Sequence, residues 1–472
     1  MATAARTREP RRRRLAAPPV GLALVLALGA LVRAGALAGY YPSVLQWIDA
    51  IQYARIEPPG FFDAYWWPAG YTGFLIAVRS VWDELAFTIG VQHVLGLVAA
   101  GLLYASARRL GAPRGVALVP AAVGALVGDF VYLEHVVMAE SLFTFVVVAG
   151  LYLAVRGLDP ELTGRARLPW LVAAAATLAA SGLIRTTGLV LPVVLGFVLL
   201  ATGWAPLRRR AVAVGAVAVT AVAIVGGYAA IATTGRHDGL FTMSGWHTYA
   251  RIAPTADCRT FTPPAGTEFL CESTPVAQRM GSFAYEWEAD TPGRRRFTWP
   301  DGNETLGRFG RAAIAADPLG YAKIVTKDLV RTIEPSAGRD RVGSGISGEM
   351  MVFGYRDPAT EALITPRLER SYDGVGVRVR ALEALDTYQR ATRLGALEKL
   401  LMVALALGGL WAARGVARRG IALFSLSALA LALAPATTLS YDIRYALPPT
   451  LLLSVAAALG GWATWRHRGA RA

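Results

Sequence analysis

The chain has 472 residues, of which 54% are hydrophobic, with a mean hydropathy of +0.41 and a formal net charge of +15. A soluble domain of this length does not bury so much apolar sequence, so the composition indicates a membrane protein. The charge does not indicate nucleic-acid binding, because the arginines occur in short runs between apolar segments and form no continuous basic stretch.

Ten apolar stretches have lengths near the roughly 20 residues that cross a bilayer core of about 30 Å, although several are short or broken. They cover residues 15–38, 85–107, 114–131, 137–156, 168–182, 186–204, 211–233, 396–414, 419–438 and 444–464. The sequence therefore predicts an all-α polytopic membrane protein, a bundle of about ten transmembrane helices.

The arginine runs predict the orientation of this bundle. If the basic N-terminus is cytoplasmic, every second loop is cytoplasmic as well, and each of these loops contains arginine, as the positive-inside rule requires. Only three lysines occur beside abundant Arg and Ala, a coding bias typical of high-GC bacterial genomes. We therefore expect a multi-pass protein of a bacterial plasma membrane, with both termini cytoplasmic. The cytoplasmic loops are Arg108–Arg114, Arg156–Arg167, Arg208–Arg210, Arg414–Arg419 and the tail Arg466–Arg471.

The remaining loops are then extracytoplasmic, and two of them are long. The first, residues 39–84, carries Trp and Tyr rings that suit helices lying at a membrane surface. The second, residues 234–395, contains three helical patterns, at 304–316, 318–333 and 376–394, which predict a mostly helical cap. Three domains follow: residues 1–235 as an N-terminal transmembrane module, 236–395 as an extracytoplasmic loop domain, and 396–472 as C-terminal helices with a basic tail.

Both cysteines of the chain, Cys258 and Cys271, fall in the second outer loop, and the Pro263, Pro264 and Gly266 between them favour a turn. Their location on the oxidising side predicts a disulfide, which stabilises a small domain by roughly 2–4 kcal/mol. The alternative is a pair of unlinked, buried thiols.

Two ionisable residues near the outer face are candidates for catalysis, because charges at membrane level are costly and are often functional. Asp49 lies just after the first span and can serve as a general base for an attacking hydroxyl, or simply as a helix cap or solvated acid. Arg185 interrupts an apolar stretch, and its fork of donors matches phosphate oxygens. The alternative for Arg185 is an arginine that snorkels to the interface.

The very short outer turn before the last span contains Asp442, Arg444 and Tyr445. Asp442 and Arg444 can simply pair with each other. Their predicted level in the membrane, the same as that of Asp49 and Arg185, indicates instead a shared cavity in which Arg444 is a second phosphate ligand.

Asp129, Glu134, His135 and Glu140 form a further polar group between the third and fourth predicted spans. Such residues can orient an acceptor, or hold a divalent cation that neutralises a leaving phosphate. Alternatively, these acids bond to neighbouring helices and bind no metal.

The acidic first outer loop and four short runs together resemble the GT-C glycosyltransferases. The runs are Pro68–Tyr71, which ends that loop, Ala139–Ser141, Leu183–Gly188 and Asp442–Tyr445. The resemblance covers about 1–235 and 396–472, and is closest to the bacterial polyprenyl-phosphate-sugar-dependent branch, near the protein mannosyltransferase and aminoarabinose transferase types. It implies that Asp49 matches the catalytic acid of the first loop, and that Arg185 and Arg444 lie near the donor phosphate. The paired Asp-Glu or Glu-Tyr signature usual in that loop is absent, since Ala50 follows Asp49.

The resemblance implies a membrane enzyme that moves a sugar, with inversion, from a polyprenyl-phosphate donor to an extracytoplasmic polysaccharide, glycolipid or protein. No nucleic-acid partner is expected. The alternative is a transporter or lipid flippase, which would be expected to show repeated halves and broken helices around a midplane site. A third interpretation is a non-catalytic scaffold whose outer loop binds partners.

Overall fold

The computed structural model describes residues 19–47, 49–55, 60–62, 65–162, 164–232, 240–334, 351–439 and 441–469. These residues are mostly helical, and the strands among them are β1 (Tyr40–Tyr41) and β2 (Arg378–Val379), which pair antiparallel. The predicted all-α class is therefore confirmed.

Within the described residues, seven helices are long and apolar enough to cross a membrane, or eight if one bent pair forms a single span. The bent pair is α5 (Arg114–Leu126) with α6 (Gly128–Glu134), which meet at 48°. The seven spans are α1 (Val20–Gly39), α4 (Leu85–Arg109), α7 (Ala139–Gly157), α10 (Leu207–Ala232), α17 (Leu382–Thr392) continuing into α18 (Ala396–Ala412), α19 (Gly415–Thr438) and α20 (Ile443–Gly469).

The predicted count of about ten spans is not confirmed, although the described residues of each predicted stretch are mostly helical. The difference lies chiefly in α8 (Leu168–Gly182) and in the helical segment Thr186–Ala201, which are too short to qualify. The second segment begins as the 3₁₀ turn η3 (Thr186–Val190) and continues as α9 (Leu191–Ala201). Arg185 lies at the break between α8 and η3, and its extended backbone conformation interrupts the helical run.

Helix α20 forms the centre of the bundle and packs against α18, α19 and α5. The outer helices instead expose apolar side chains, as expected for surfaces that face lipid. Val212, Val219 and Val222 on α10 are exposed, as are Leu24 and Leu31 on α1. This distribution, with an apolar outside as well as an apolar core, agrees with a protein that spans the membrane many times.

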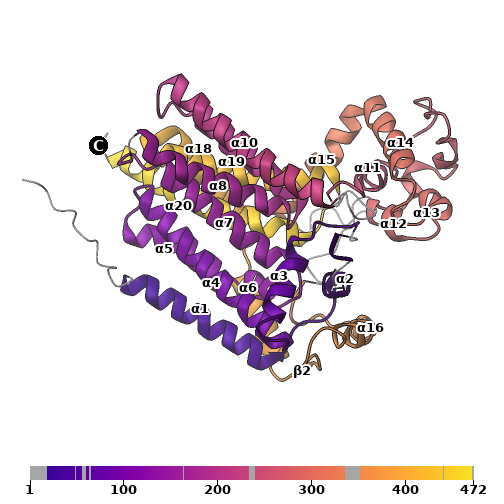
Figure 1. The fold of residues 1–472 in the computed structure, drawn as a ribbon, viewed down its shortest axis with the longest axis horizontal. Helices are drawn as coiled ribbons and strands as arrows, with labels where there is room; N and C mark the ends of the chain where they lie inside the picture. The colour runs from indigo at the N-terminus through magenta and orange to yellow at the C-terminus, as the bar shows by residue number, and fades with distance from the viewer. Residues whose placement is uncertain are drawn as a thin grey trace, which may run out of the picture.

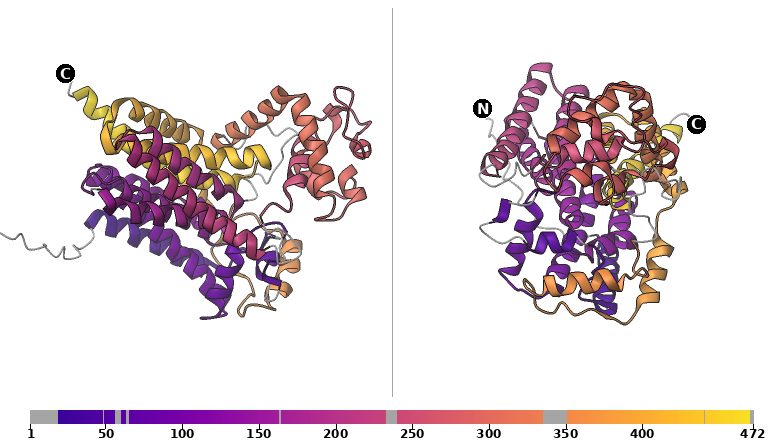
Figure 2. Two further views of the ribbon diagram at one scale, coloured as in Figure 1. Left: turned by 45° about the horizontal axis from the view of Figure 1, so that its top comes forward. Right: turned by 90° about the vertical axis from the view of Figure 1, so that its right-hand side faces the viewer.

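The two ends of the bundle differ. The start of α1 and the end of α20 lie together at one end, and the opposite end carries two further groups of helices (Figures 1 and 2). Two short helices of the first long loop, α2 (Asp49–Arg55) and α3 (Gly70–Arg79), also lie at that opposite end. The predicted outer loops thus gather at one end of the bundle.

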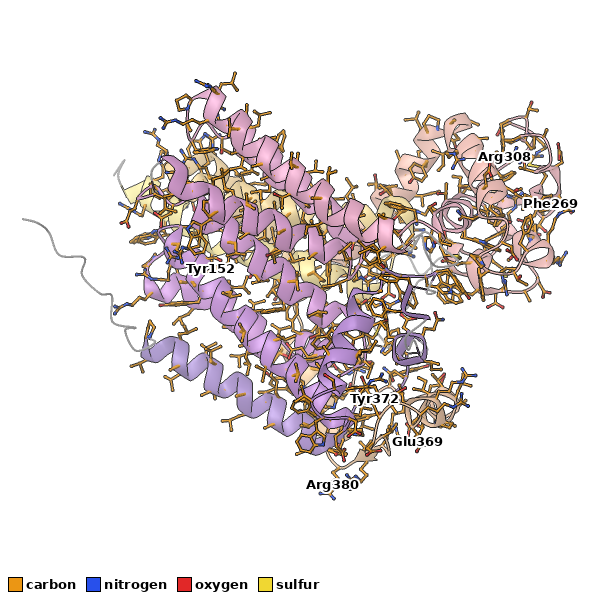
Figure 3. All side chains as sticks on the ribbon, viewed as in Figure 1. Tyr152, Phe269, Arg308, Glu369, Tyr372 and Arg380 are labelled. Atoms are coloured by element: carbon orange, nitrogen blue, oxygen red, sulfur yellow. A yellow bond between two sulfur atoms is a disulfide. The ribbon has the colours of Figure 1, made fainter. Side chains whose placement is uncertain are left out.

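One of these groups, which we call the cap, is formed by residues 240–333. It has its own apolar core, centred on Trp246, Tyr249 and Phe309, and Cys258 is joined to Cys271 by a disulfide. Figure 3 shows Phe269 and Arg308 within it. Its helices are α11 (Ser244–Ile252), α12 (Ser282–Trp287), α13 (Pro292–Arg296), α14 (Asn303–Ala316) and α15 (Pro318–Ile333), and the last two agree with the helices predicted at 304–316 and 318–333.

The other group belongs to the core of the bundle. Phe353 and Leu368 join the same apolar core as the transmembrane helices, and α16 (Pro358–Leu368) packs on α2. Figure 3 shows Tyr372 and Arg380 here, well apart from the cap. The predicted loop domain 236–395 therefore comprises two parts that pack in different places.

The helix predicted over 376–394 is wrong in its first part, where Arg378–Val379 form β2. These residues pair with Tyr40–Tyr41 at the end of α1, so a tertiary contact replaces the local helical preference. The remaining short elements are the 3₁₀ turns η1 (Gly60–Phe62), η2 (Gly164–Arg167), η4 (Glu268–Leu270) and η5 (Val276–Gln278).

The contact between α18 and α20 depends on glycine. A Cβ added to Gly460 would lie 2.1 Å from the carbonyl oxygen of Leu405, so Gly460→Ala must push two packed helices apart. We expect a loss of about 1–3 kcal/mol in the free energy of unfolding, measured as a lower melting temperature of the purified protein in detergent. Gly215→Ala is the matched control, because that position on α10 has open space around it. An equal melting temperature for both variants would contradict the proposed close contact.

Candidate active site

A cavity of about 730 Å³ lies where four distant parts of the chain meet. Its walls come from the first outer loop, the η3 and α9 segment, the cap, and the turn between α19 and α20. Asp49, Arg185, Asp442, Arg444 and Tyr445 all line this cavity. Five residues selected from the sequence thus share one site.

Arg444 is the centre of the charged cluster in this cavity. Its Nη1 donates to Asp49 Oδ2 over 2.7 Å, and its Nε donates to Asp442 Oδ2 over 2.6 Å. Because Asp49 belongs to the first loop and Arg444 to the last helix, this ion pair joins the two ends of the sequence.

Glu140 connects the second arginine to the same cluster. Arg185 Nη1 donates to Glu140 Oε1, and that oxygen also lies 3.7 Å from Nη1 of Arg444. The ring of Tyr445 lies beside both guanidinium groups, with its centroid 4.8 Å from Cζ of Arg185 and 5.5 Å from Cζ of Arg444. The two guanidinium groups therefore lie close to each other, beside the ring of Tyr445.

The first loop is docked directly on the helix break that carries Arg185. Gly70 donates its N–H to the carbonyl of Leu183 over 2.9 Å, and a Cβ at Gly70 would lie only 2.4 Å from that oxygen. Only glycine permits this approach of the two backbones. The run Pro68–Tyr71 and the break at Arg185, chosen separately from the sequence, are thus in contact.

The charges of the cluster do not cancel. Three carboxylates, those of Asp49, Glu140 and Asp442, face two guanidinium groups, so the fully ionised cluster has one excess negative charge. Burial raises the pKa of the Asp442 carboxyl above its usual value, against the opposing charge of Arg444. An anion that enters must therefore displace a carboxylate from an arginine, or bind together with a proton.

Glu134 and His135 do not line this cavity. Glu134 accepts from Arg33 Nε and Nη2 over 2.7 and 2.8 Å, and its Oε2 lies 3.0 Å from Nδ1 of His93. His93 in turn contacts His135, and burial together with His93 lowers the pKa of His135 to about 3. These residues form a buried network between helices, as in the alternative considered from the sequence.

Asp129 also pairs within the protein, with Arg393 Nη2 over 2.7 Å and Gln389 Nε2 over 2.7 Å. The cation-binding alternative requires several of these acids and histidines to converge. Among the described residues, no group of three or more His, Cys, Asp or Glu side chains is arranged to hold a metal ion.

Two sets of residues were not expected from the sequence. Arg33 lies inside the first predicted span. A single arginine within a membrane span predicts that an acidic side chain lies next to it. His247, Glu286 and Trp287 line the cavity from the cap, about 200 residues beyond Asp49. No local pattern indicates that the cap folds over this site.

The family model described as dolichyl-phosphate-mannose-protein mannosyltransferase matches residues 81–252. This match confirms the resemblance to the membrane glycosyltransferases over that part of the chain, which includes Glu140 and Arg185. No curated protein matches the chain by sequence.

Two solved structures match most of this chain at low sequence identity. The oligosaccharyltransferase AglB from Archaeoglobus fulgidus, in complex with an inhibitory peptide and a dolichol-phosphate, is 14% identical, with 93% of this chain and 50% of that chain covered and a TM-score of 0.46. ArnT from Cupriavidus metallidurans, bound to undecaprenyl phosphate, is 17% identical, with 96% and 79% covered and a TM-score of 0.37. The chain spans about half the length of the archaeal structure that it matches.

The network around Glu134 leads to a stability prediction. Glu134→Ala leaves the buried guanidinium of Arg33 without its carboxylate, which is expected to cost about 3–5 kcal/mol in the free energy of unfolding. Thermal unfolding in detergent measures this loss. Glu369→Ala, which removes an exposed acid, should change stability by no more than about 0.5 kcal/mol. The double variant Arg33→Leu with Glu134→Leu should be more stable than Glu134→Ala, and the opposite order would refute this explanation.

Proposed function

We propose that this chain is a membrane glycosyltransferase that takes a sugar from a polyprenyl-phosphate donor and transfers it, with inversion, to an extracytoplasmic acceptor. The observation that carries the proposal is that Asp49, Arg185 and Arg444 line one cavity. The family match over residues 81–252 supports the same class of reaction. The transporter or flippase alternative is not favoured, because the polar cluster lies at one end of the bundle.

The lipid phosphate of the donor fits between Arg185 and Arg444. Guanidinium groups provide paired donors for phosphate oxygens, and the cavity concentrates two of them around Tyr445. Next to this polar end, the cavity is lined by apolar side chains such as Val190, Val193 and Ala434. Val193 is largely exposed on α9, so this wall offers a path along which a polyprenyl chain can extend into the surrounding lipid.

Asp49 is the general base. An acceptor hydroxyl attacks the anomeric carbon from the face opposite the phosphate, and its proton moves to Asp49. The bond from the anomeric carbon to the phosphate oxygen breaks, and the lipid phosphate leaves with the electron pair. Because this leaving group is a stabilised anion, positioning and arginine charge supply most of the catalysis.

The ion pair between Asp49 and Arg444 requires the donor to bind before Asp49 can act as a base. While Asp49 accepts from Arg444 Nη1, this carboxylate oxygen is occupied and is not free to accept a proton from a hydroxyl. A donor phosphate that takes this place on Arg444 releases Asp49 for proton abstraction. Donor binding thus activates the base, which limits reaction with a hydroxyl when no donor is present.

We further propose that the cap faces the extracytoplasmic side of a bacterial plasma membrane and that both termini are cytoplasmic. The basic side chains at the end of α20, Arg466 and Arg468, support this orientation through the positive-inside rule. The domain division into residues 1–235, 236–395 and 396–472 remains a prediction, and the second domain contains both the cap and the segment packed on α2.

The function is tested with purified protein in lipid, incubated with a panel of radiolabelled polyprenyl-phosphate sugars. Asp49→Asn should lower the rate of sugar transfer by about 10²- to 10⁴-fold through loss of the base. Arg185→Ala should lower it by about 10²- to 10³-fold through loss of charge compensation. Asp83→Asn, which changes an exposed acid outside the cavity, is the control and should leave the rate unchanged.

Two results would refute the enzymatic proposal. One is an equal rate for wild type and Asp49→Asn. The other is the absence of transfer or hydrolysis with every donor, combined with movement of a solute across liposomes, which would favour the transporter.

A further inference from the structure

We propose that the cap side of the cavity is an acceptor subsite for a saccharide, and that the acceptor therefore presents a sugar ring. The subsite consists of the stacked rings of Trp66 and Trp287 together with the His247–Glu286 pair, all of which line the cavity. This inference rests on the proposed glycosyl transfer for its place in the reaction, but the binding site can be tested without any transfer.

The two indoles form a rigid aromatic platform. The rings of Trp66 and Trp287 are nearly parallel, at 11°, with centroids 4.7 Å apart. Trp299 meets both rings edge-on at 5.2 Å and holds the pair in place. Trp66 and Trp287 remain only partly buried, so the stack can offer an indole face to a ligand. An indole face with fixed orientation suits the apolar C–H face of a sugar ring.

A polar pair lies beside this platform. Nδ1 of His247 and Oε1 of Glu286 are in hydrogen-bond contact, and the ring of His247 lies 6.0 Å from that of Trp66. Glu286 is 8% exposed and lines the cavity, so its carboxylate is largely shielded from bulk water. A carboxylate and an imidazole next to an aromatic face together match the hydroxyl edge and the C–H face of one saccharide.

A series of neighbouring aromatic rings leads from the platform toward Asp49, the proposed general base. Trp66 lies 6.1 Å from Trp67, and Trp67 lies 5.0 Å from Tyr53. Tyr53 is one helical turn after Asp49 on α2, so both side chains are on the same face of that helix. A sugar stacked on the platform is thus guided toward Asp49. Asp49 takes the proton of the attacking hydroxyl of this sugar. The anomeric carbon of the donor then forms its bond to the acceptor oxygen as its bond to the phosphate oxygen breaks.

A second part of the cavity wall has a different chemistry. It consists of apolar side chains on α9 and α19, including Val193 and Ala434, which suit a lipid tail. The residues of the proposed subsite come instead from the cap and the first outer loop. This division gives the donor lipid and the acceptor separate walls.

The binding site is tested by saturation-transfer-difference NMR on the full-length protein in lipid nanodiscs, without donor. The probes are methyl hexopyranosides, methyl pentofuranosides, and short peptides containing Ser and Thr. At least one glycoside should receive saturation on its ring C–H protons, and Trp287→Ala should reduce this signal at least fivefold. Trp82→Ala, which removes an exposed indole outside the cavity, should leave it unchanged.

Glu286→Gln provides a second variant that preserves the platform. It should weaken glycoside binding about threefold or more while C–H saturation persists at high glycoside concentration. Full signal in a Trp287→Ala protein with normal thermal stability would overturn the proposal. If Trp287→Ala does not fold, unchanged binding in Glu286→Gln would overturn it. A Trp287-dependent signal from the peptides and from no glycoside would also overturn it.

These outcomes are separable from those of the proposed function. Asp49→Asn should lower the rate of transfer by about 10²- to 10⁴-fold but leave the glycoside signal intact. Loss of transfer in every donor assay, with a glycoside signal that still depends on Trp287, would refute the transferase and retain the saccharide site.

Discussion

The ion pair between Asp49 and Arg444 is the interaction on which the site depends. It connects the first outer loop to the last transmembrane helix, and Asp442 holds the same guanidinium from the other side. At membrane level an unpaired charge is expensive, so each member of this cluster keeps the others in place. The cost of leaving a charge unpaired therefore holds the cluster together and keeps two arginines at the cavity, where they can bind an anionic ligand.

Much of the site could be predicted because its residues break strong local patterns. Arg185 interrupts an apolar stretch, and Asp442 and Arg444 occupy a short turn between two spans, so each is conspicuous in the sequence. Asp442 and Arg444 form the pair considered from the sequence, but the contact between Asp49 and Arg444 could not be predicted, since it joins segments 395 residues apart. The helix count failed for a related reason: α8 and α9 are apolar enough, but the break at Arg185 shortens both.

Glu134 and His135 show that polar residues near a membrane segment do not by themselves identify a functional site. They have the residue types of a catalytic or metal site, yet Arg33 and His93 satisfy their hydrogen bonds inside the bundle. Sequence proximity grouped them with Glu140, whereas the structure separates Glu140 from them and turns it toward Arg185. What distinguishes the two roles is whether the side chain bonds to a residue that lines the cavity, as Glu140 does through Arg185.

The position of the cap over this cavity is set by a second buried charge cluster. Arg251 of α11 pairs with Asp328 of α15 over 2.5 Å, and its Nη2 donates to the carbonyl of Ala436 on α19 over 2.7 Å. Arg331 lies beside the same carboxylate, and all three side chains are almost completely buried. Such a cluster is costly to break once formed. Because α19 leads directly into the turn that carries Asp442 and Arg444, this contact connects the cap, which carries Trp287, to Arg444 through a single helix.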